Sequence, residues 1–280
     1  MTGRRLILAF LFLLAATACG QRAEPTGTLP LYPVTVPRPG ESAIVLPSRP
    51  QRVSAVTPPA VEVVRALAKG EGLELNLPGK VELDELRMFR PRLIVASPEA
   101  SRDELEQAAR ATKAPVYVFP DSSIRDVEHG MTDLGLLLGS QLKARRLVSG
   151  IESKRQAIRS RVGDLKKVTV FVDTGFFVTV PTNSLIGQLV DDAGGHDIAG
   201  TTSGPFSLAR LARVDPDVYL ATSDSGTTLR DLRKNPATAK LRAIRTGRFS
   251  VVPADLLQPG PRIGDALVTI AKILHPGAFR

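Results

Sequence analysis

Short apolar runs alternate with helical patterns along most of the chain, and this alternation constrains the fold more than any other feature. The runs are RVSAV at 52–56, RLIVAS, PVYVFP, VTVFVD, VYLAT and RFSVVP. Continuous apolar runs of this length are typical of strands that are buried on both faces. Helices are predicted at 58–70, 82–89, 101–112, 124–138, 183–193, 228–243 and 262–274. The pattern therefore predicts an α/β fold with mostly parallel sheets that are covered by helices.

A longer helical pattern, from Gln141 to Leu165, divides this alternation in two. Its apolar residues recur on one face of a helix that would be about 37 Å long. They are Leu147, Ile151, Ile158, Val162 and Leu165. The simplest architecture is two α/β lobes joined by one long α-helix. We place the N-lobe at 34–138, the interdomain helix at 139–166 and the C-lobe at 167–280.

An internal sequence repeat supports two lobes. The stretch LDELRMFRPRLIVAS at 83–97 matches LARLARVDPDVYLAT at 208–222 at fixed offsets, and Pro91 aligns with Pro216. Both stretches read as a short amphipathic helix, a proline stop and a buried strand. The match is expected either from two related lobes or from independent use of a common α/β unit.

Residues 1–18 have the layout of a secretory signal peptide. Two arginines precede an apolar run, 6–16, that is shorter than the roughly 20 residues of a transmembrane helix. Ala16-Thr17-Ala18-Cys19 resembles a bacterial lipobox, in which cleavage leaves a lipid-bearing cysteine as the first residue. The same small residues also fit an ordinary cleavage site, which would leave Cys19 without lipid. We expect an exported chain, anchored through Cys19 to the outer face of the cell membrane or held in the periplasm.

Residues 19–33 read as a proline-interrupted tether, and two β-prone runs, YPVTV and SAIVL, follow as a hairpin-like start. The net charge is +9, and removing residues 1–18 takes away Arg4 and Arg5 and leaves +7. This basic balance favours anionic partners such as membrane head groups or an acidic ligand. Nucleic acid is not expected, because the Lys and Arg residues are spread along the chain and no basic run contains interleaved aromatics.

Catalytic and metal-binding patterns are missing from the sequence. No nucleophile elbow, P-loop or dinucleotide-binding motif occurs, and His129, His196 and His275 are scattered. The GGHD segment at 194–197 reads as a turn after a helix, with His196 facing solvent. We therefore predict that the chain is not an enzyme and has no catalytic residue, cofactor or metal site. Haem is harder to exclude because one Tyr or His can bind its iron, although Tyr117 and Tyr219 read as core residues.

Four stretches make the chain resemble the substrate-binding lipoproteins of cobalamin and ferric-siderophore ABC importers. In order, they are RPQRVSAVTPPAVEVVRALAKG, LDELRMFRPRLIVA, SLIGQLVDDAGGHDIAG and PGPRIGDALVTIAKILHPGAF. The resemblance implies a periplasmic-binding-protein fold with a long helical linker. It also implies a monomer that takes one iron-chelate or cobalamin ligand between its lobes and delivers it to an ABC permease. One departure is the short EGLELNLPGK segment at 71–80, which implies a more open cleft on that side.

The resemblance places the ligand cleft at loops that follow the strands, which agrees with the general rule for open α/β sheets. The candidate ligand-binding residues are Thr57, Pro58, Ser97, Ser122, Phe176, Phe177, Ser223 and Arg262. For Phe176 and Phe177, we expect either one ring in the core and one facing a ligand, or both in the core. Arg262 begins a helix and is expected either to pair with an anionic ligand group or to form a salt bridge.

The resemblance also implies one carboxylate on each lobe for docking to the permease. In the N-lobe this position is Asp84, with Glu85 beside it, but in the C-lobe it is Ala209, followed by Arg210. Either the cognate permease has the opposite charge on that side, or the chain does not serve a permease. The alternative function is therefore a lipid-anchored protein of the same fold that binds an envelope partner.

Overall fold

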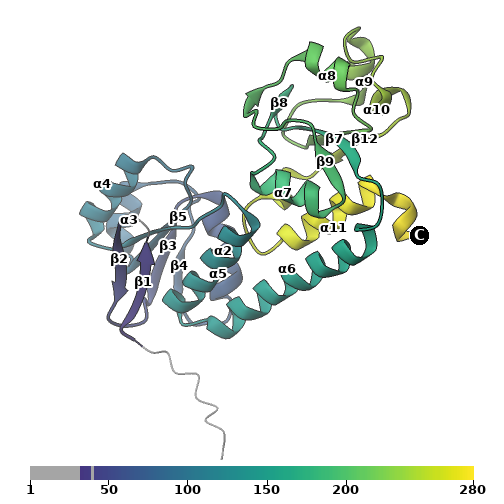
Figure 1. Ribbon diagram of the computed structural model, residues 1–280. Helices are drawn as coiled ribbons and strands as arrows, with labels where there is room; N and C mark the ends of the chain where they lie inside the picture. Colours follow the sequence, from purple (N-terminus) through teal and green to yellow (C-terminus); the bar gives the residue numbers. More distant parts are fainter. Residues whose placement is uncertain (1–31, 39–40) are drawn as a thin grey trace, which may run out of the picture. The chain divides into compact units, whose positions relative to one another are not determined.

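The computed structural model describes residues 32–38 and 41–280 (Figure 1). The predicted signal peptide, Cys19 and most of the predicted tether lie outside the described residues. Residues 32–280 form one compact unit, which contains three clusters of buried apolar side chains. Within the described ranges, no helix is long and apolar enough to cross a membrane.

The first lobe contains a four-stranded parallel sheet in the order β4-β3-β5-β6. Its strands are β3 (Arg52–Ala55), β4 (Glu74–Asn76), β5 (Leu93–Ala96) and β6 (Val116–Val118). Its helices are α2 (Pro58–Ala68), α3 (Leu83–Phe89), α4 (Arg102–Thr112) and α5 (Ile124–Leu138). All four residues of β5 are buried, as expected for a strand covered on both faces. An antiparallel hairpin of β1 (Val34–Arg38) and β2 (Glu41–Leu46) precedes the sheet, as predicted.

The second lobe contains a parallel sheet in the order β12-β11-β7-β9. Its strands are β7 (Val168–Asp173), β9 (Gly195–Asp197), β11 (Val218–Thr222) and β12 (Phe249–Val252), and the short β8 (Val178–Thr179) pairs with β10 (Gly204–Pro205). Its helices are α7 (Leu185–Asp192), α8 (Leu208–Val214), α9 (Leu229–Lys234), α10 (Arg242–Arg245), α11 (Ile263–Leu274) and the 3₁₀ turns η1 (Ala254–Leu257) and η2 (Pro276–Phe279). The two parallel sheets confirm the predicted α/β class with two lobes.

The two sheets have the same strand order. In each, the first strand lies between the second strand on one side and the third on the other, and the fourth strand is at the far edge. Helices α3 and α8, which belong to the two matching sequence stretches, also end in the same way, at Arg90 and Asp215. Both residues have a positive φ and donate a backbone hydrogen bond to the carbonyl four residues earlier. The repeat therefore extends over the whole sheet, beyond the residues in which the sequence shows it.

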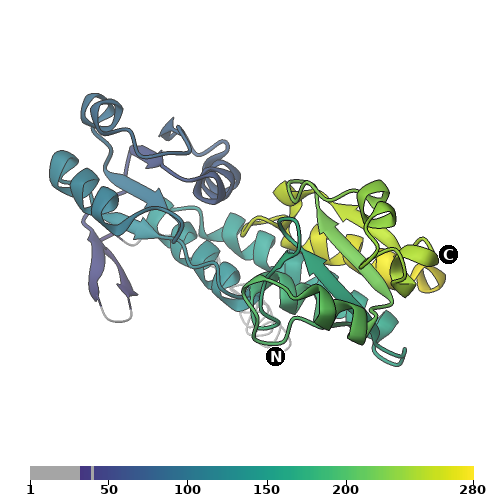
Figure 2. The same ribbon diagram turned by 90° about the horizontal axis from the view of Figure 1, so that it is seen from above.

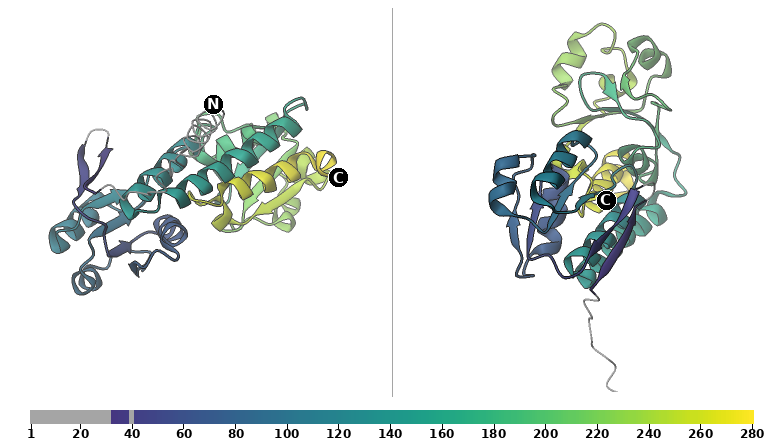
Figure 3. Two further views of the ribbon diagram at one scale, coloured as in Figure 1. Left: turned by 90° about the horizontal axis from the view of Figure 1, so that it is seen from below. Right: turned by 90° about the vertical axis from the view of Figure 1, so that its left-hand side faces the viewer.

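Helix α6 (Gln141–Val162) runs between the lobes and packs against α5 of the first and α11 of the second (Figures 1, 2 and 3). Its buried residues include Ile151 and Ile158 on the predicted apolar face. The helix ends before Leu165, where the pattern had placed its end. The chain turns after Gly163, and Leu165 is exposed, so no burial favours another helical turn.

Two other predictions were wrong. The helix expected at 228–243 is two short helices, α9 and α10. Pro236 lacks an N–H and disfavours helical geometry at the preceding Asn235, whose backbone is extended. In the GGHD segment, Gly194 lies in a turn after α7, as expected, but Gly195–Asp197 form strand β9 rather than continuing the turn. Gly195 packs so closely against Val190 that a β-carbon would not fit. His196 is exposed, as expected.

Candidate functional site

Both sheets have a switch point, where successive connections leave in opposite directions. It lies between β3 and β5 in the first lobe and between β7 and β11 in the second. Ligands of open α/β sheets bind beyond the carboxyl ends of the strands at such points. The candidate site is therefore formed by the loops after these four strands, which contain most of the predicted ligand-binding residues.

In the first lobe, Thr57 and Ser97 join the two switch-point loops. The Thr57 hydroxyl oxygen accepts hydrogen bonds from the Ser97 backbone N–H, at 2.9 Å, and from the Ser97 hydroxyl, at 3.1 Å. Both residues are buried, so their observed role is to hold the loops together. Pro58, the first residue of α2, and Ser122, in the loop between β6 and α5, are both exposed. A ligand contact by any of these residues stays a prediction.

In the second lobe, Asp173 organises the loop after β7. Its carboxylate is fully buried, and one oxygen accepts hydrogen bonds at 2.6 Å from the hydroxyls of Tyr219 and Thr227. The other oxygen accepts from the backbone N–H groups of Gly175 and Phe177, at 3.1 and 2.9 Å. Burial and the bond to Asp173 raise the pKa of Tyr219 above its usual value. Sequence reasoning missed Asp173, although an acidic residue that ends an apolar strand was the available signal.

The loop that Asp173 holds has unusual backbone geometry. Phe176 and Phe177 have φ values of 46° and 67°, in the left-handed region that bulky L-residues rarely adopt. The Phe176 N–H donates to the Ser225 carbonyl, and the Phe177 carbonyl accepts from the Phe206 N–H. Backbone strain of this kind persists where the surroundings enforce it, and it gathers at ligand-binding sites.

The two adjacent rings have different surroundings. The Phe177 ring is half-buried and packs against the apolar cluster of the second lobe, whereas the Phe176 side chain is 64% exposed. Their centroids are 5.0 Å apart. The expectation that both rings lie in the core is therefore wrong. The sequence-based alternative, that the outer ring contacts a ligand, stays a prediction.

A hollow of about 270 Å³ lies beside the Phe176 ring. Its lining comes from the loops after β7 and β11 and from α9, and it consists of Phe176, Phe177, Thr227, Asp231, Leu232, Lys234 and Asn235. Lys234 is exposed and forms no ion pair within the described part of the chain. The open aromatic face suits a flat, partly apolar ligand. Lys234 offers a cation to a negative group of such a ligand, and the Asp231 carboxylate in the same lining limits the net positive charge there.

Arg262 forms salt bridges with two carboxylates of the chain itself. Its guanidinium donates to both carboxylate oxygens of Glu62 in the first lobe and to the carboxylate and backbone carbonyl of Asp255. The hydrogen bond that Arg262 donates to Glu62 is the main reason that the pKa of Arg262 is raised. Of the two expectations for this residue, the structure contains the salt bridge. Ser223 is exposed, and its hydroxyl accepts from the Ala254 N–H at 2.9 Å.

The predicted docking residues differ in how they are presented. The Asp84 side chain is 92% exposed and pairs with Arg87 at 2.8 Å, and Glu85 is also exposed. Arg210 instead folds back onto its own lobe, where it donates to Thr202 and to two backbone carbonyls and lies over the Phe206 ring. Ala209 is exposed beside it. Across residues 32–38 and 41–280, no three His, Cys, Asp or Glu side chains gather as a metal site would require.

Comparison with known proteins gives a consistent result. A family profile described as "Periplasmic binding protein" matches residues 48–256. A cobalamin-binding protein of Halobacterium salinarum is 24% identical, over 87% of this chain and 74% of its own length. The iron-uptake system-binding protein of Bacillus subtilis is also 24% identical, over 91% and 92%. The apo structure of the periplasmic heme-binding protein RhuT from Roseiflexus sp. RS-1 superposes with a TM-score of 0.71 at 21% identity and covers 81% of this chain and 99% of its own.

Proposed function

Because this chain belongs to the periplasmic binding protein family, we propose that it captures one cobalamin, iron-chelate or haem-type ligand between its lobes for an ABC import permease. The relatives named for cobalamin, iron uptake and heme support this range of ligands. The observation that carries the proposal is the exposed Phe176 ring, which is held in a left-handed conformation beside a hollow at the switch point of the second sheet.

The proposed chemistry is capture without catalysis. Corrinoids, porphyrins and aromatic iron chelates present a broad conjugated face, which can stack on an exposed phenyl ring. The carboxylates of a porphyrin, or the negative charge of a ferric catecholate, would be attracted to Lys234, which lines the hollow. The loop needs no folding on binding, because Asp173 already fixes its backbone. A pre-organised site loses less conformational entropy on binding.

The experiment is a calorimetric titration of the purified chain with cobalamin, a ferric hydroxamate, a ferric catecholate and haem. We expect one of the four to bind with a dissociation constant below about 100 μM, which corresponds to roughly −5.5 kcal/mol. Lys234→Gln should weaken an anionic ligand, whereas Lys240→Gln, which removes an exposed cation outside the hollow, should not. Failure of all four ligands to bind would contradict the proposal.

We also propose that Cys19 carries a lipid that anchors the chain to the membrane. The support is its position after a small-residue cleavage site and before the proline-interrupted segment. In cells that express the full chain, the wild type should fractionate with membranes and Cys19→Ser should be soluble. A wild type that is as soluble as the variant would contradict the anchor.

Delivery to a permease is the last part of the proposal, and Asp84 and Glu85 are its docking residues. Ala209 favours a second candidate, an anchored protein that binds an envelope partner, because this lobe lacks the second carboxylate. In liposomes that contain the cognate permease, Asp84→Ala should slow association, since charges at an interface rim mainly steer encounter. Ala209→Glu should give no gain if the permease charge is reversed on that side. No association of the wild type would favour the second candidate.

A further inference from the structure

The amino-terminal end of the first sheet carries a basic hollow, on the side away from the switch-point loops. It measures about 1150 Å³ and lies beneath the starts of β3, β5 and β6. The charged residues that line it are Arg49, Arg52, Arg87, Arg90, Arg92 and Lys113, and no acidic residue lines it. We call these six residues with their hollow the basic face.

Four cations of the basic face lack a carboxylate partner. Arg49 pairs with Glu71 and Arg87 with Asp84. The other four form no ion pair in the described part of the chain, and they are Arg52, Arg90, Arg92 and Lys113. The backbone brings them together, because the Arg92 N–H donates to the Arg52 carbonyl at 2.7 Å, and Arg90 and Lys113 are the left-handed residues that end α3 and α4.

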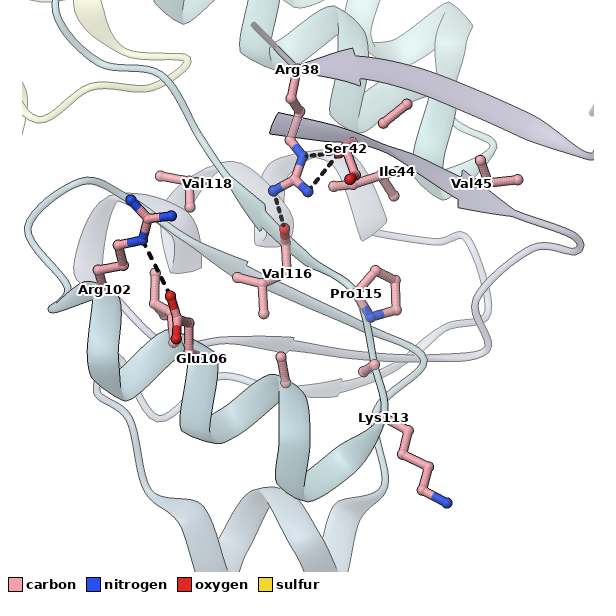
Figure 4. Close-up of a pocket in the computed structure, with 14 residues that line it drawn as sticks. Arg38, Ser42, Ile44, Val45, Arg102, Glu106, Lys113, Pro115, Val116 and Val118 are labelled. Carbon is pink, nitrogen blue, oxygen red and sulfur yellow. Dashed lines mark hydrogen bonds and ion pairs between the residues drawn. The ribbon is translucent and has the colours of Figure 1, made fainter. Parts of the chain in front are cut away.

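A neighbouring groove has a different set of charged residues (Figure 4). It has a similar volume, about 1160 Å³, and lies between the β1–β2 hairpin and α4. Its Arg38 donates to the backbone carbonyls of Ser42 and Val116, and its Arg102 pairs with Glu106 at 3.2 Å. Lys113 belongs to both hollows. The groove is therefore lined by three cations and one carboxylate, whereas the basic face is lined by six cations and no carboxylate.

The chain enters the compact unit next to the basic face. The hydroxyl of Tyr32, the first described residue, donates to the Leu137 carbonyl at 3.0 Å. Arg49, which lines the hollow, donates to the next carbonyl, that of Leu138, at 2.8 Å. Only twelve residues, 20–31, separate Tyr32 from Cys19, and fully extended they would span at most about 40 Å. A lipid on Cys19 would keep this end of the first lobe close to the bilayer.

We propose that the basic face rests on an anionic phospholipid surface. The proposal rests on the proposed anchoring, and it adds a second contact to the lipid. Guanidinium groups bind phosphate oxygens by paired hydrogen bonds, and several cations near an anionic leaflet contribute together. While the chain is not docked to a permease, this orientation turns the switch-point loop ends of the first sheet away from the membrane.

A competing explanation is that Arg90 and Lys113 only stabilise the helices that they end. Cations at a helix carboxyl terminus interact favourably with its dipole. This explanation does not include Arg52 and Arg92, which lie at strand starts. It also predicts an effect on stability alone, whereas the proposal predicts an effect on lipid binding.

The test uses residues 32–280, which form one compact unit with all three apolar clusters and contain no lipid anchor. Flotation with vesicles of phosphatidylglycerol and phosphatidylcholine in equal parts should show binding at low salt, and vesicles of phosphatidylcholine alone should show none. The triple variant Arg90→Asn, Arg92→Gln and Lys113→Asn should lower the partition coefficient about 100-fold. Asn is used at the two left-handed positions because it tolerates that conformation.

The matched control removes the same charge from the second lobe, through Arg230→Gln, Arg233→Gln and Arg245→Gln. It should bind anionic vesicles nearly as well as the unchanged chain, and thermal melts of both triple variants should show that they are folded. Equal losses in the two variants, or no binding of the unchanged chain, would overturn the proposal. The ligand titration does not depend on this result, and the Cys19→Ser fractionation is made independent of it by a high-salt wash, which screens binding through the basic face but does not extract a lipid anchor. Failure here is therefore distinguishable from failure of the proposed function.

Discussion

Arg262 and Glu62 lie 200 residues apart in the sequence, and their side chains tie the two lobes together. Arg262 Nε donates to Glu62 Oε1 at 2.7 Å, and Nη2 donates to Oε2 at 3.3 Å. Glu62 belongs to α2 of the first lobe, and Arg262 immediately precedes α11 of the second. The pair is bidentate, so it fixes orientation as well as distance.

Arg262→Lys should lower the free energy of unfolding by about 1 kcal/mol, because lysine keeps the charge but cannot form the paired hydrogen bonds. Glu62→Gln should cost a similar amount, and the double variant little more than either one. Urea unfolding measures all three. Arg87→Lys, which alters an exposed pair within one helix, should cost less than about 0.5 kcal/mol. Strictly additive losses for Arg262 and Glu62 would show that the two residues do not act as a pair.

Asp173→Asn should lower the free energy of unfolding by about 3 kcal/mol, because the buried negative charge is lost and two of the four donors face an amide N–H₂ in place of an acceptor oxygen. Thermal and urea unfolding provide the measurement. Asp164→Asn is the matched control, since Asp164 is exposed and forms no ion pair within the described residues. Asp164→Asn should lower the free energy of unfolding by less than about 0.5 kcal/mol. If both variants unfold alike, Asp173 does not hold the loop.

Phe176→Gly should separate stability from binding. Glycine adopts the left-handed conformation without strain, so the free energy of unfolding should stay unchanged or rise by up to about 1 kcal/mol. Affinity for the captured ligand should nevertheless fall about tenfold, because the exposed ring is lost. Lys113→Gly removes a similar left-handed side chain far from the loop and should leave ligand affinity unchanged. A large loss of stability in Phe176→Gly would mean that the ring serves packing.

Glu128 makes the stability depend on pH. One of its carboxylate oxygens is buried without a hydrogen-bond partner, and Arg155 lies 3.7 Å away. Burial, followed by the nearby Glu152 carboxyl, raises the pKa of Glu128 from 4.5 to about 7. The folded chain therefore keeps a proton that the unfolded chain releases near pH 4.5. The resulting stabilisation is complete below pH 4.5 and is lost as the pH rises to about 7.

Glu128→Gln mimics the protonated form and should remove this loss. At pH 8 we expect the variant to be more stable than the wild type by about 1–2 kcal/mol, and at pH 4.5 the two should be equal. Urea unfolding across this range measures the difference. Asp197, whose pKa burial raises to about 6, titrates in both proteins and cancels in the comparison. Glu85→Gln, at an exposed site, should follow the wild type at every pH.

Much of the fold could be predicted from the sequence, because burial on both faces leaves a direct pattern. The central strands are continuous apolar runs, and α5 occupies the predicted 124–138. The three-residue edge strands β4 and β9 were not predicted, since backbone pairing to a neighbour defines them and side-chain pattern does not. The break before Pro236 was present in the sequence as an Asn-Pro pair and was overlooked.

The candidate site was partly predictable for a similar reason. Phe176 and Phe177 stood out because two aromatics directly follow a buried strand. Asp173 did not, because an acid at a strand end looks like a surface residue until Tyr219 and Thr227 are known to cover it. The sequence around Arg262 could not predict that it pairs with Glu62 either, since Glu62 lies in the other lobe.

Each lobe is a continuous stretch of chain on its own side of α6, and this sets the order in which the fold can be completed. All the strands of the first sheet precede α6, so they can pair while the second half of the chain is still being synthesised. The second lobe must wait longer, because α11, which packs on α6, comes after all of that lobe's strands. A ribosome paused between β12 and α11 would therefore hold a finished first lobe and a second that lacks its closing helix.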